Sequence, residues 1–260
     1  MLDEIVANKQ QEIEEAKSRL PFDELQSRVK NHLAERDFRK ALQRAEGKLA
    51  LIAELKRKSP SRGMLRERFD PVHLAQEMQE AGASAISVLT DEVYFGGQID
   101  FLKDVKDFTE IPVLRKDFVV DPYQVYETAA YGADAILLIV RVLAEEMLLQ
   151  CMQAADRLGV EPLVEVHSEA ELRLALSVGS RVIGINHRDL RTMAIDPTLT
   201  EKLVPKVPAG KIIVAESGIQ TAEGVKRMKQ LGVHAVLIGE ALMTTPRPAE
   251  KIKELFADVW

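Results

Sequence analysis

The sequence has a single cysteine, Cys151, so it cannot form a disulfide within the chain. The helical pattern around it, EEMLLQCMQAADRLG, favours a small core residue over a reactive thiol. The five histidines show neither HxxxH nor HExxH spacing, and there is no cysteine–histidine set, so we do not expect a protein-built metal site. A serine hydrolase is not indicated either, because no G-x-S-x-G motif is present.

Excess charge and long apolar runs are also missing. The net charge of −6 argues against a general nucleic-acid binder, which needs a basic face. The most apolar stretch, ADAILLIV, is far too short to span a bilayer. The N-terminal segment MLDEIVANKQQEIEEAKSRL lacks the basic start and apolar core of a signal peptide. We therefore expect a cytoplasmic protein without a nucleic-acid or membrane partner.

The sequence does contain a repeated unit, in which an amphipathic segment ends in glycine and an apolar run follows. The copies are AGASAISV (81–88), YGADAILL (131–138), LGVEPLVEV (158–166), VGSRVIGIN (178–186) and LGVHAVLI (231–238). Glycine commonly ends helices because it enters the left-handed conformation freely. Short apolar runs without alternation are typical of parallel strands buried on both faces. Three further runs, 49–55, 111–118 and 211–216, bring the expected strands to eight.

Eight strand–helix alternations in about 210 residues predict an α/β fold, a closed (β/α)8 TIM barrel. An open doubly wound sheet is the alternative, but no GxGxxG follows the first strand. Residues 1–48 precede the repeat, and no linker-like segment separates them from it. We expect them to form extra helices near one barrel opening, so that 1–260 is a single domain with its barrel core at 49–260.

Ionisable and polar residues gather where the expected strands finish, which is where barrel enzymes place their active sites. Side-chain alternation makes Ile52, Glu54 and Lys56 face the barrel interior, while Leu51 and Leu55 face the helices. The strand-end residues are Glu54, Lys56, Lys116, Glu165, Asn186, Arg188, Glu216 and Ser217. Converging charges of both signs can separate acid and base roles. A buried ion-pair network that only closes the barrel is the alternative.

Two glycine-containing turns predict a phosphate site. ESG (216–218) and GEAL (239–242) follow the last two strands, where barrels of this class frequently bind phosphate, although each could be a plain turn. The basic segment 57–70 predicts a lid over an anionic substrate, with a solvated surface loop as the alternative. Phe95 or Phe118 could hold a planar ring or serve only in packing. His167 and His187 also fall beside strand ends.

Together these segments resemble the indole-3-glycerol-phosphate synthase family of tryptophan biosynthesis, over essentially the whole chain. The segments are IAELKRKSPSRG, SVLTDEVYFGG, LRKDFVVDPYQ, GADAILLIV, LVEVHSEAEL, IGINHRDL, VAESGI and LIGEALM. The resemblance implies a carboxy-lyase that needs no cofactor or metal. Its small anionic substrate would be 1-(2-carboxyphenylamino)-1-deoxyribulose 5-phosphate, and its products indole-3-glycerol phosphate, carbon dioxide and water.

The same resemblance implies roles for individual residues. Lys116 would be the general acid of ring closure, and Glu165 would be the acid or base of dehydration. Lys56 would contact the substrate carboxylate or phosphate and would protonate the leaving hydroxyl. The order in which these three act stays open. The other implied catalytic residues are Glu54, Asn186, Glu216 and Ser217. The implied substrate contacts are Ser59, Phe95, Phe118, Leu137 and Arg188. The implied phosphate contacts are Lys56, Gly218, Gly239 and Glu240. Lys58 and His187 depart from the family's usual residues at the lid and the rim.

Other functions remain as alternatives. A phosphoribosyl isomerase or a tryptophan synthase α subunit would share the phosphate turns, but neither predicts Glu54-x-Lys56 together with Lys116. A barrel kept only as a binding module would be expected to lose Glu54, Lys116 or Glu165, and all three are present. We expect a monomer, with a weak dimer as the alternative.

Overall fold

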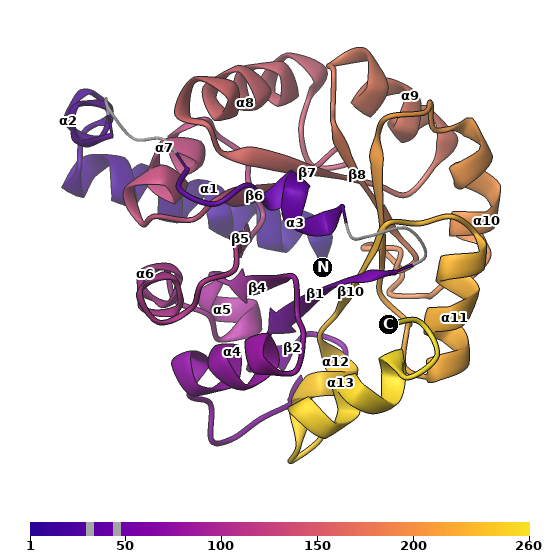
Figure 1. The fold of residues 1–260 in the computed structure, drawn as a ribbon. Coiled ribbons are helices and arrows are strands. Elements are labelled where there is room, and N and C mark those ends of the chain that lie inside the picture. The colour runs from indigo at the N-terminus through magenta and orange to yellow at the C-terminus, as the bar shows by residue number, and fades with distance from the viewer. Residues whose placement is uncertain (30–33, 44–47) are drawn as a thin grey trace.

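The computed structural model describes residues 1–29, 34–43 and 48–260. Its centre is a closed barrel of eight parallel strands in the order β1-β10-β9-β8-β7-β6-β5-β4 (Figure 1). The strands are β1 (Ala50–Leu55), β4 (Ala85–Leu89), β5 (Val113–Lys116), β6 (Ala135–Ile139), β7 (Glu161–Val166), β8 (Val182–Asn186), β9 (Ile212–Glu216) and β10 (Ala235–Ile238). Strand β1 pairs with both β4 and β10, which closes the ring. The predicted (β/α)8 barrel is confirmed, and the open sheet is wrong.

A ring of helices surrounds the strands (Figure 1). The longer ones are α4 (Pro71–Glu80), α6 (Asp100–Phe108), α7 (Tyr123–Ala130), α8 (Glu145–Leu158), α9 (Glu169–Ser177), α11 (Ala222–Gln230) and α13 (Pro248–Phe256). The short ones are α5 (Glu92–Phe95), α10 (Leu199–Leu203), the 3-10 turn η1 (Val204–Lys206) and α12 (Glu240–Met243). Helices α4, α9 and α11 begin after Asp70, Ser168 and Thr221, and each of these residues accepts a backbone N–H through its side chain. Among the described helices, none is long and apolar enough to cross a membrane.

Two apolar layers result from the alternation along each strand. Ile52 belongs to the cluster inside the barrel, whereas Leu51 and Leu55 belong to the cluster between strands and helices. Cys151 of α8 lies in the outer cluster and is buried, as expected of a core residue. Because the next inward position after Ile52 is Glu54, the polar strand ends stand directly above an apolar floor.

The N-terminal helices cover both ends of the barrel rather than the single opening that we expected. They are α1 (Leu2–Arg19), α2 (Phe22–Arg28) and α3 (Phe38–Leu42). Leu2 of α1 reaches the mouth at the carboxyl ends of the strands. Phe38 and Leu42 of α3 join the inner apolar cluster near Ala50, which begins β1 at the opposite end. Both helices project over the ring of strands in Figure 1. Helix α3 ends at Leu42, and 44–47 lie outside the described residues.

The segment from 57 to 70 is not the structureless loop that its composition suggested. Strands β2 (Lys58–Ser59) and β3 (Gly63–Met64) form a small antiparallel hairpin within it. Beyond the hairpin, the Arg66 guanidinium donates a hydrogen bond of 2.8 Å to the Thr245 carbonyl, close to α12. The segment is therefore paired within itself and held to the end of the barrel by Arg66, and its movement as a lid stays a prediction.

Candidate active site

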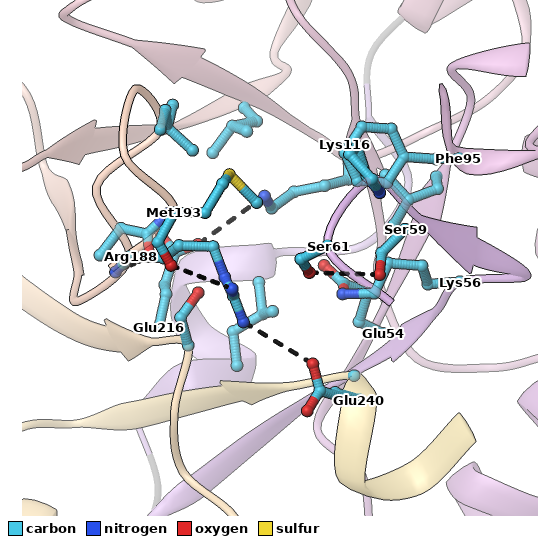
Figure 2. A pocket seen from close by; sticks show the side chains of 18 of the residues that line it. Glu54, Lys56, Ser59, Ser61, Phe95, Lys116, Arg188, Met193, Glu216 and Glu240 are labelled. Carbon is cyan, nitrogen blue, oxygen red and sulfur yellow. Dashed lines mark hydrogen bonds and ion pairs between the residues drawn. The ribbon is translucent and has the colours of Figure 1, made fainter. Parts of the chain in front are cut away.

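A pocket at the carboxyl ends of the strands brings together almost all of the predicted site residues (Figure 2). Its space not filled by protein atoms is about 1090 Å³, part of it open to solvent. The predicted residues that line it are Glu54, Lys56, Ser59, Phe95, Lys116, Phe118, Leu137, Asn186, Arg188, Glu216, Ser217, Gly218, Gly239 and Glu240. Glu165 is not part of the lining, but it contacts Lys116 from beneath.

Lys116 of β5 lies between two carboxylates on the pocket floor. Its Nζ is 3.7 Å from Glu165 Oε2 on β7 and 3.9 Å from Glu216 Oε2 on β9. Burial opposes the charged form, but attraction to Glu165, Glu216 and Glu54 outweighs it and raises the pKa of Lys116. Lys116 is therefore a cation that keeps its proton at neutral pH and can deliver it to a substrate oxygen.

The pKa values of the two carboxyl groups are shifted in opposite directions. Burial opposes ionisation of Glu165, yet Lys116 and His167 together lower its pKa to about 2. Burial, followed by the negative charge of Glu165, raises the pKa of Glu216 well above its usual range. No oxygen of either group accepts a hydrogen bond of ordinary geometry from a described residue. The floor thus holds two carboxyl groups whose pKa values are shifted in opposite directions, which is how neighbouring carboxyl groups take base and acid roles.

Glu54 and Lys56, the two charges that end β1, pair with each other. Lys56 Nζ is 2.5 Å from Glu54 Oε1, and the Glu54 side chain is almost fully buried. Burial raises the pKa of Glu54, but Lys56 and Lys116 outweigh burial and lower it overall. This carboxylate consequently stays ionised and can orient both lysines.

Two glycines provide the space that the side chains of Glu216 and Glu54 occupy. A Cβ atom built on Gly184 of β8 would stand 2.2 Å from Glu216 Oε1, and one on Gly239 would stand 2.2 Å from Glu54 Oε1. Both separations are far below any real contact. The glycines at these two inward positions therefore have a steric purpose that the sequence reasoning, which assigned only Gly239 a role, did not find.

A polar rim lies on the side of β8 and β10. Arg188 Nη2 is 3.6 Å from Glu240 Oε2 (Figure 2). Arg62 Nε is 3.2 Å from Glu240 Oε1. The Arg188 backbone N–H donates to Asn186 Oδ1 over 3.0 Å, which orients that amide. The Ser59 hydroxyl is 3.5 Å from that of Ser61. Arginine and amide groups at this rim suit an anionic ligand.

The opposite side of the pocket is apolar. The rings of Phe95 and Phe118 lie 6.0 Å apart at 37°, and Leu137 is part of the same lining. Leu2 and Ile5 of α1 complete this side, and the sequence reasoning missed them. Their helical spacing was interpreted only as a packing face, because nothing in a helical period shows which cavity the face covers.

The ion pairs of two buried residues near the pocket, His167 and Lys9, were not predicted from the sequence. His167 Nε2 is 3.2 Å from Glu165 Oε1 and its Nδ1 is 3.3 Å from Glu171 Oε2. Burial opposes the charge on His167, but the two glutamates raise its pKa to about 9. Lys9 of α1 is 2.9 Å from Asp117 Oδ1, beside Lys116. Neither His167 nor His187, which the sequence reasoning noted beside strand ends, lines the pocket.

The arrangement of metal-binding side chains in the described residues does not support a metal site. Across 1–29, 34–43 and 48–260, no group of three or more histidine, cysteine, aspartate or glutamate side chains has an arrangement that could hold a metal ion.

Fold and pocket define an enzyme of the (β/α)8-barrel class. Solved structures of this fold resemble the chain: 3-hexulose-6-phosphate synthase from Salmonella typhimurium has a TM-score of 0.65 at 18% identity, covering 80% of this chain and 96% of that one. Thiamine phosphate pyrophosphorylase from Pyrococcus furiosus has a TM-score of 0.62 at 19% identity, covering 82% and 96%. At these identities the likeness shows the fold alone.

Sequence comparison assigns the family. The family model "Indole-3-glycerol phosphate synthase" matches residues 2–255. Curated proteins of that name are 44% identical in Carboxydothermus hydrogenoformans (98% of this chain, 99% of that protein) and 45% identical in Acetivibrio thermocellus (99% of each). The relative in Dehalococcoides mccartyi is 46% identical over 98% of this chain and 99% of its own length. The chain belongs to the indole-3-glycerol phosphate synthase family.

Proposed function

We propose that this protein is a carboxy-lyase that converts 1-(2-carboxyphenylamino)-1-deoxyribulose 5-phosphate to indole-3-glycerol phosphate, carbon dioxide and water. Family membership supports the reaction. The observation that carries the mechanism is the position of Lys116, 3.7 Å from Glu165 and 3.9 Å from Glu216 at the base of a pocket with one apolar and one polar side.

Lys116 serves as the general acid of ring closure. The ring carbon that bears the carboxylate attacks the ketone carbon, and Lys116 protonates the ketone oxygen as the carbon–carbon bond forms. The electrons of the broken bond to carbon dioxide then return to the ring. The three neighbouring carboxyl groups keep Lys116 charged before the step, so a proton is present at the pocket floor where the ketone oxygen would lie.

Dehydration needs a second acid and a base. Lys56 protonates the hydroxyl group, which leaves as water, and ionised Glu165 accepts a proton from the adjacent carbon of the new ring. The lowered pKa of Glu165 supports the base role. Glu54 orients Lys56, and Glu216 with Asn186 and Ser217 positions the reacting groups. All of these side chains except Glu165 line the pocket.

The substrate lies across the pocket from the apolar to the polar side. Its aromatic ring packs between Phe95, Phe118 and Leu137, and Ser59 contacts it near the lid hairpin. Its phosphate lies at the other end, against Arg188 and the backbone of Gly218 and Gly239–Glu240, with Lys56 near its anionic groups. The separation of apolar and cationic lining supports this orientation, since each part of the substrate meets its own kind of surface.

The test is the rise of indole fluorescence when the purified protein meets the carboxyphenylamino ketose phosphate. We expect turnover without added metal or cofactor, and turnover slower by about 10²–10⁴-fold from Lys116→Ala at the same concentration. A folded wild-type protein that produces no indole would contradict the proposal. Isomerisation of a phosphoribosyl substrate would then indicate an isomerase. Binding of a sugar phosphate without turnover would indicate a barrel kept as a binding module.

We also propose a cellular location, an oligomeric state and a set of partners for the protein. It acts in the cytoplasm as a monomer, without a nucleic-acid or membrane partner, on its small phosphorylated substrate. The net charge of −6 supports the lack of a nucleic-acid partner. Light scattering during size-exclusion chromatography across a tenfold concentration range distinguishes the monomer from a weak dimer.

A further inference from the structure

The turn that follows β9 has an unusual backbone. Ser217 has φ = +65° and Gly218 has φ = +74°. The left-handed region suits glycine, but for serine it costs free energy, and such a residue persists only where its surroundings hold it. Ser217 and Gly218 both line the pocket. Something close to this turn must therefore stabilise it.

His187, the residue after β8, holds the turn from outside the pocket. Its side chain is buried, and Nδ1 lies 3.0 Å from the Ser217 carbonyl oxygen. A carbonyl oxygen only accepts, so Nδ1 carries the proton and donates it. Nε2 lies 2.6 Å from the hydroxyl of Thr200, a fully buried residue of α10. Burial lowers the pKa of His187, so the ring is neutral and Nε2 accepts the Thr200 proton.

The main chain of His187 is fixed as well. Its N–H donates to the Glu216 carbonyl over 3.0 Å, and its own carbonyl accepts from the Asp196 N–H over 2.8 Å. The ring therefore cannot follow the Ser217 carbonyl if that carbonyl turns. His187 is a fixed donor to a strained turn.

The orientation of one carbonyl determines that of the next N–H. In a trans peptide the C=O and the following N–H point in opposite directions, and the described chain has no cis peptide bonds. Because the Ser217 carbonyl points to His187, the Gly218 N–H points the other way, to the pocket side. Among the described residues it has no hydrogen-bond acceptor. Gly218 cannot gain a side chain here, since a Cβ would stand 2.9 Å from Ile195 Cγ2.

We propose that His187 is a positioning residue that anchors the Ser217 carbonyl and thereby directs the Gly218 N–H at the phosphate group of the substrate. His187 itself does not touch the substrate. The inference rests on the proposed function for the identity of the anion.

Two substitutions at His187 separate donation from packing. The side-chain nitrogen of asparagine is bonded to Cγ, like histidine Nδ1, so His187→Asn keeps a donor near the same place. His187→Leu places a methyl group there and removes the donor. Losing a hydrogen bond to a charged group typically costs about tenfold or more in affinity. We therefore expect KM, and the Kd for inorganic phosphate, to rise about tenfold or more in His187→Leu, with kcat within about threefold of wild type.

Controls distinguish positioning from stability. Thr200→Val removes the hydroxyl behind the ring but leaves the Nδ1 contact, so it is expected to lower the melting temperature while phosphate affinity stays within about twofold. His187→Asn is expected to keep most of the phosphate affinity. Equal loss of affinity in the Asn and Leu variants, or unchanged affinity in a folded His187→Leu protein, would overturn the proposal.

A measurement on the wild-type protein does not depend on any variant folding. Titration of ¹⁵N-labelled protein with inorganic phosphate is expected to shift the Gly218 amide resonance and to slow its hydrogen exchange. No response at Gly218 under saturating phosphate overturns the inference even if the enzyme turns over. If Gly218 responds to phosphate but the protein forms no indole-3-glycerol phosphate, the proposed reaction is rejected and the proposed anion site is supported.

Discussion

Replacing Gly184 by alanine should disable the enzyme through a single displaced carboxylate. The added Cβ would stand 2.2 Å from Glu216 Oε1 and 3.3 Å from Leu163 Cδ1. Ordinary contact begins at 3.4 Å, so the Glu216 oxygen has to retreat by 3.4 − 2.2 = 1.2 Å or more. Misplacing a catalytic group by about 1 Å can cost about 10²-fold in rate. We therefore expect kcat to fall about 10²-fold.

The backbone of Gly184 makes this a steric test. Its φ lies outside the left-handed region, so alanine meets no backbone penalty there. Gly224→Ala is the matched control, because Gly224 lies in α11 and its new Cβ would stand at an ordinary 3.4 Å from Thr221 Oγ1. We expect Gly224→Ala to leave kcat unchanged.

Indole fluorescence at saturating substrate measures kcat for both variants, and far-UV circular dichroism checks the fold. A folded Gly184→Ala protein with kcat within about twofold of wild type would refute the reasoning. It would show that Glu216 either moves without consequence or has no part in the reaction.

Three further predictions test the charged groups around the pocket. Lys116→Ala should lower kcat by about 10²–10⁴-fold with the fold intact, since one acid or base group supplies about that much; near-normal turnover would reject its role. His167 has its pKa raised from 6.5 to about 9, so its stabilisation is complete below pH 6.5 and is lost as the pH rises through 9. Urea denaturation should therefore show His167→Asn less stable than wild type by on the order of 3 kcal/mol at pH 6, with the gap closing above pH 9; a pH-independent gap would contradict this. Lys9→Met should lower the free energy of unfolding by about 3–5 kcal/mol, because it leaves Asp91 and Asp117 buried without this cation, and a loss below about 1 kcal/mol in urea would be inconsistent with that pairing.

The barrel and the membership of the pocket were predictable because both follow from local periodicity. Glycine after each helical segment and an apolar run after each glycine identify the strands, for example around Gly132 and β6. Strict alternation then assigns Glu54 and Lys56 to the inside once Leu51 and Leu55 are assigned to the helix side. In a closed barrel all the strand ends meet, so inward polar residues at those ends reach one pocket.

Other features were not predictable because they depend on how separate elements pack. The apolar face of α1 indicated a helix that buries one side, but only the structure places Leu2 at the mouth of the pocket and Phe38 of α3 at the opposite end. The basic residues of 57–70 suggested an open loop, whereas pairing of Lys58 with Met64 makes a hairpin. Strands of only two residues are too short to show an alternating pattern in the sequence, so the pairing could not be predicted from it.

The sequence by itself determined which residues face inward and which strand ends carry charge, because side-chain direction repeats every two residues along a strand. The tertiary structure alone decided how those charges act on one another. The opposite shifts in the pKa values of Glu165 and Glu216 depend on distances to Lys116 and His167 and on burial by elements from all parts of the chain. Coulombic interaction and desolvation are set by separation and surroundings in space, and these exist only once the barrel has closed.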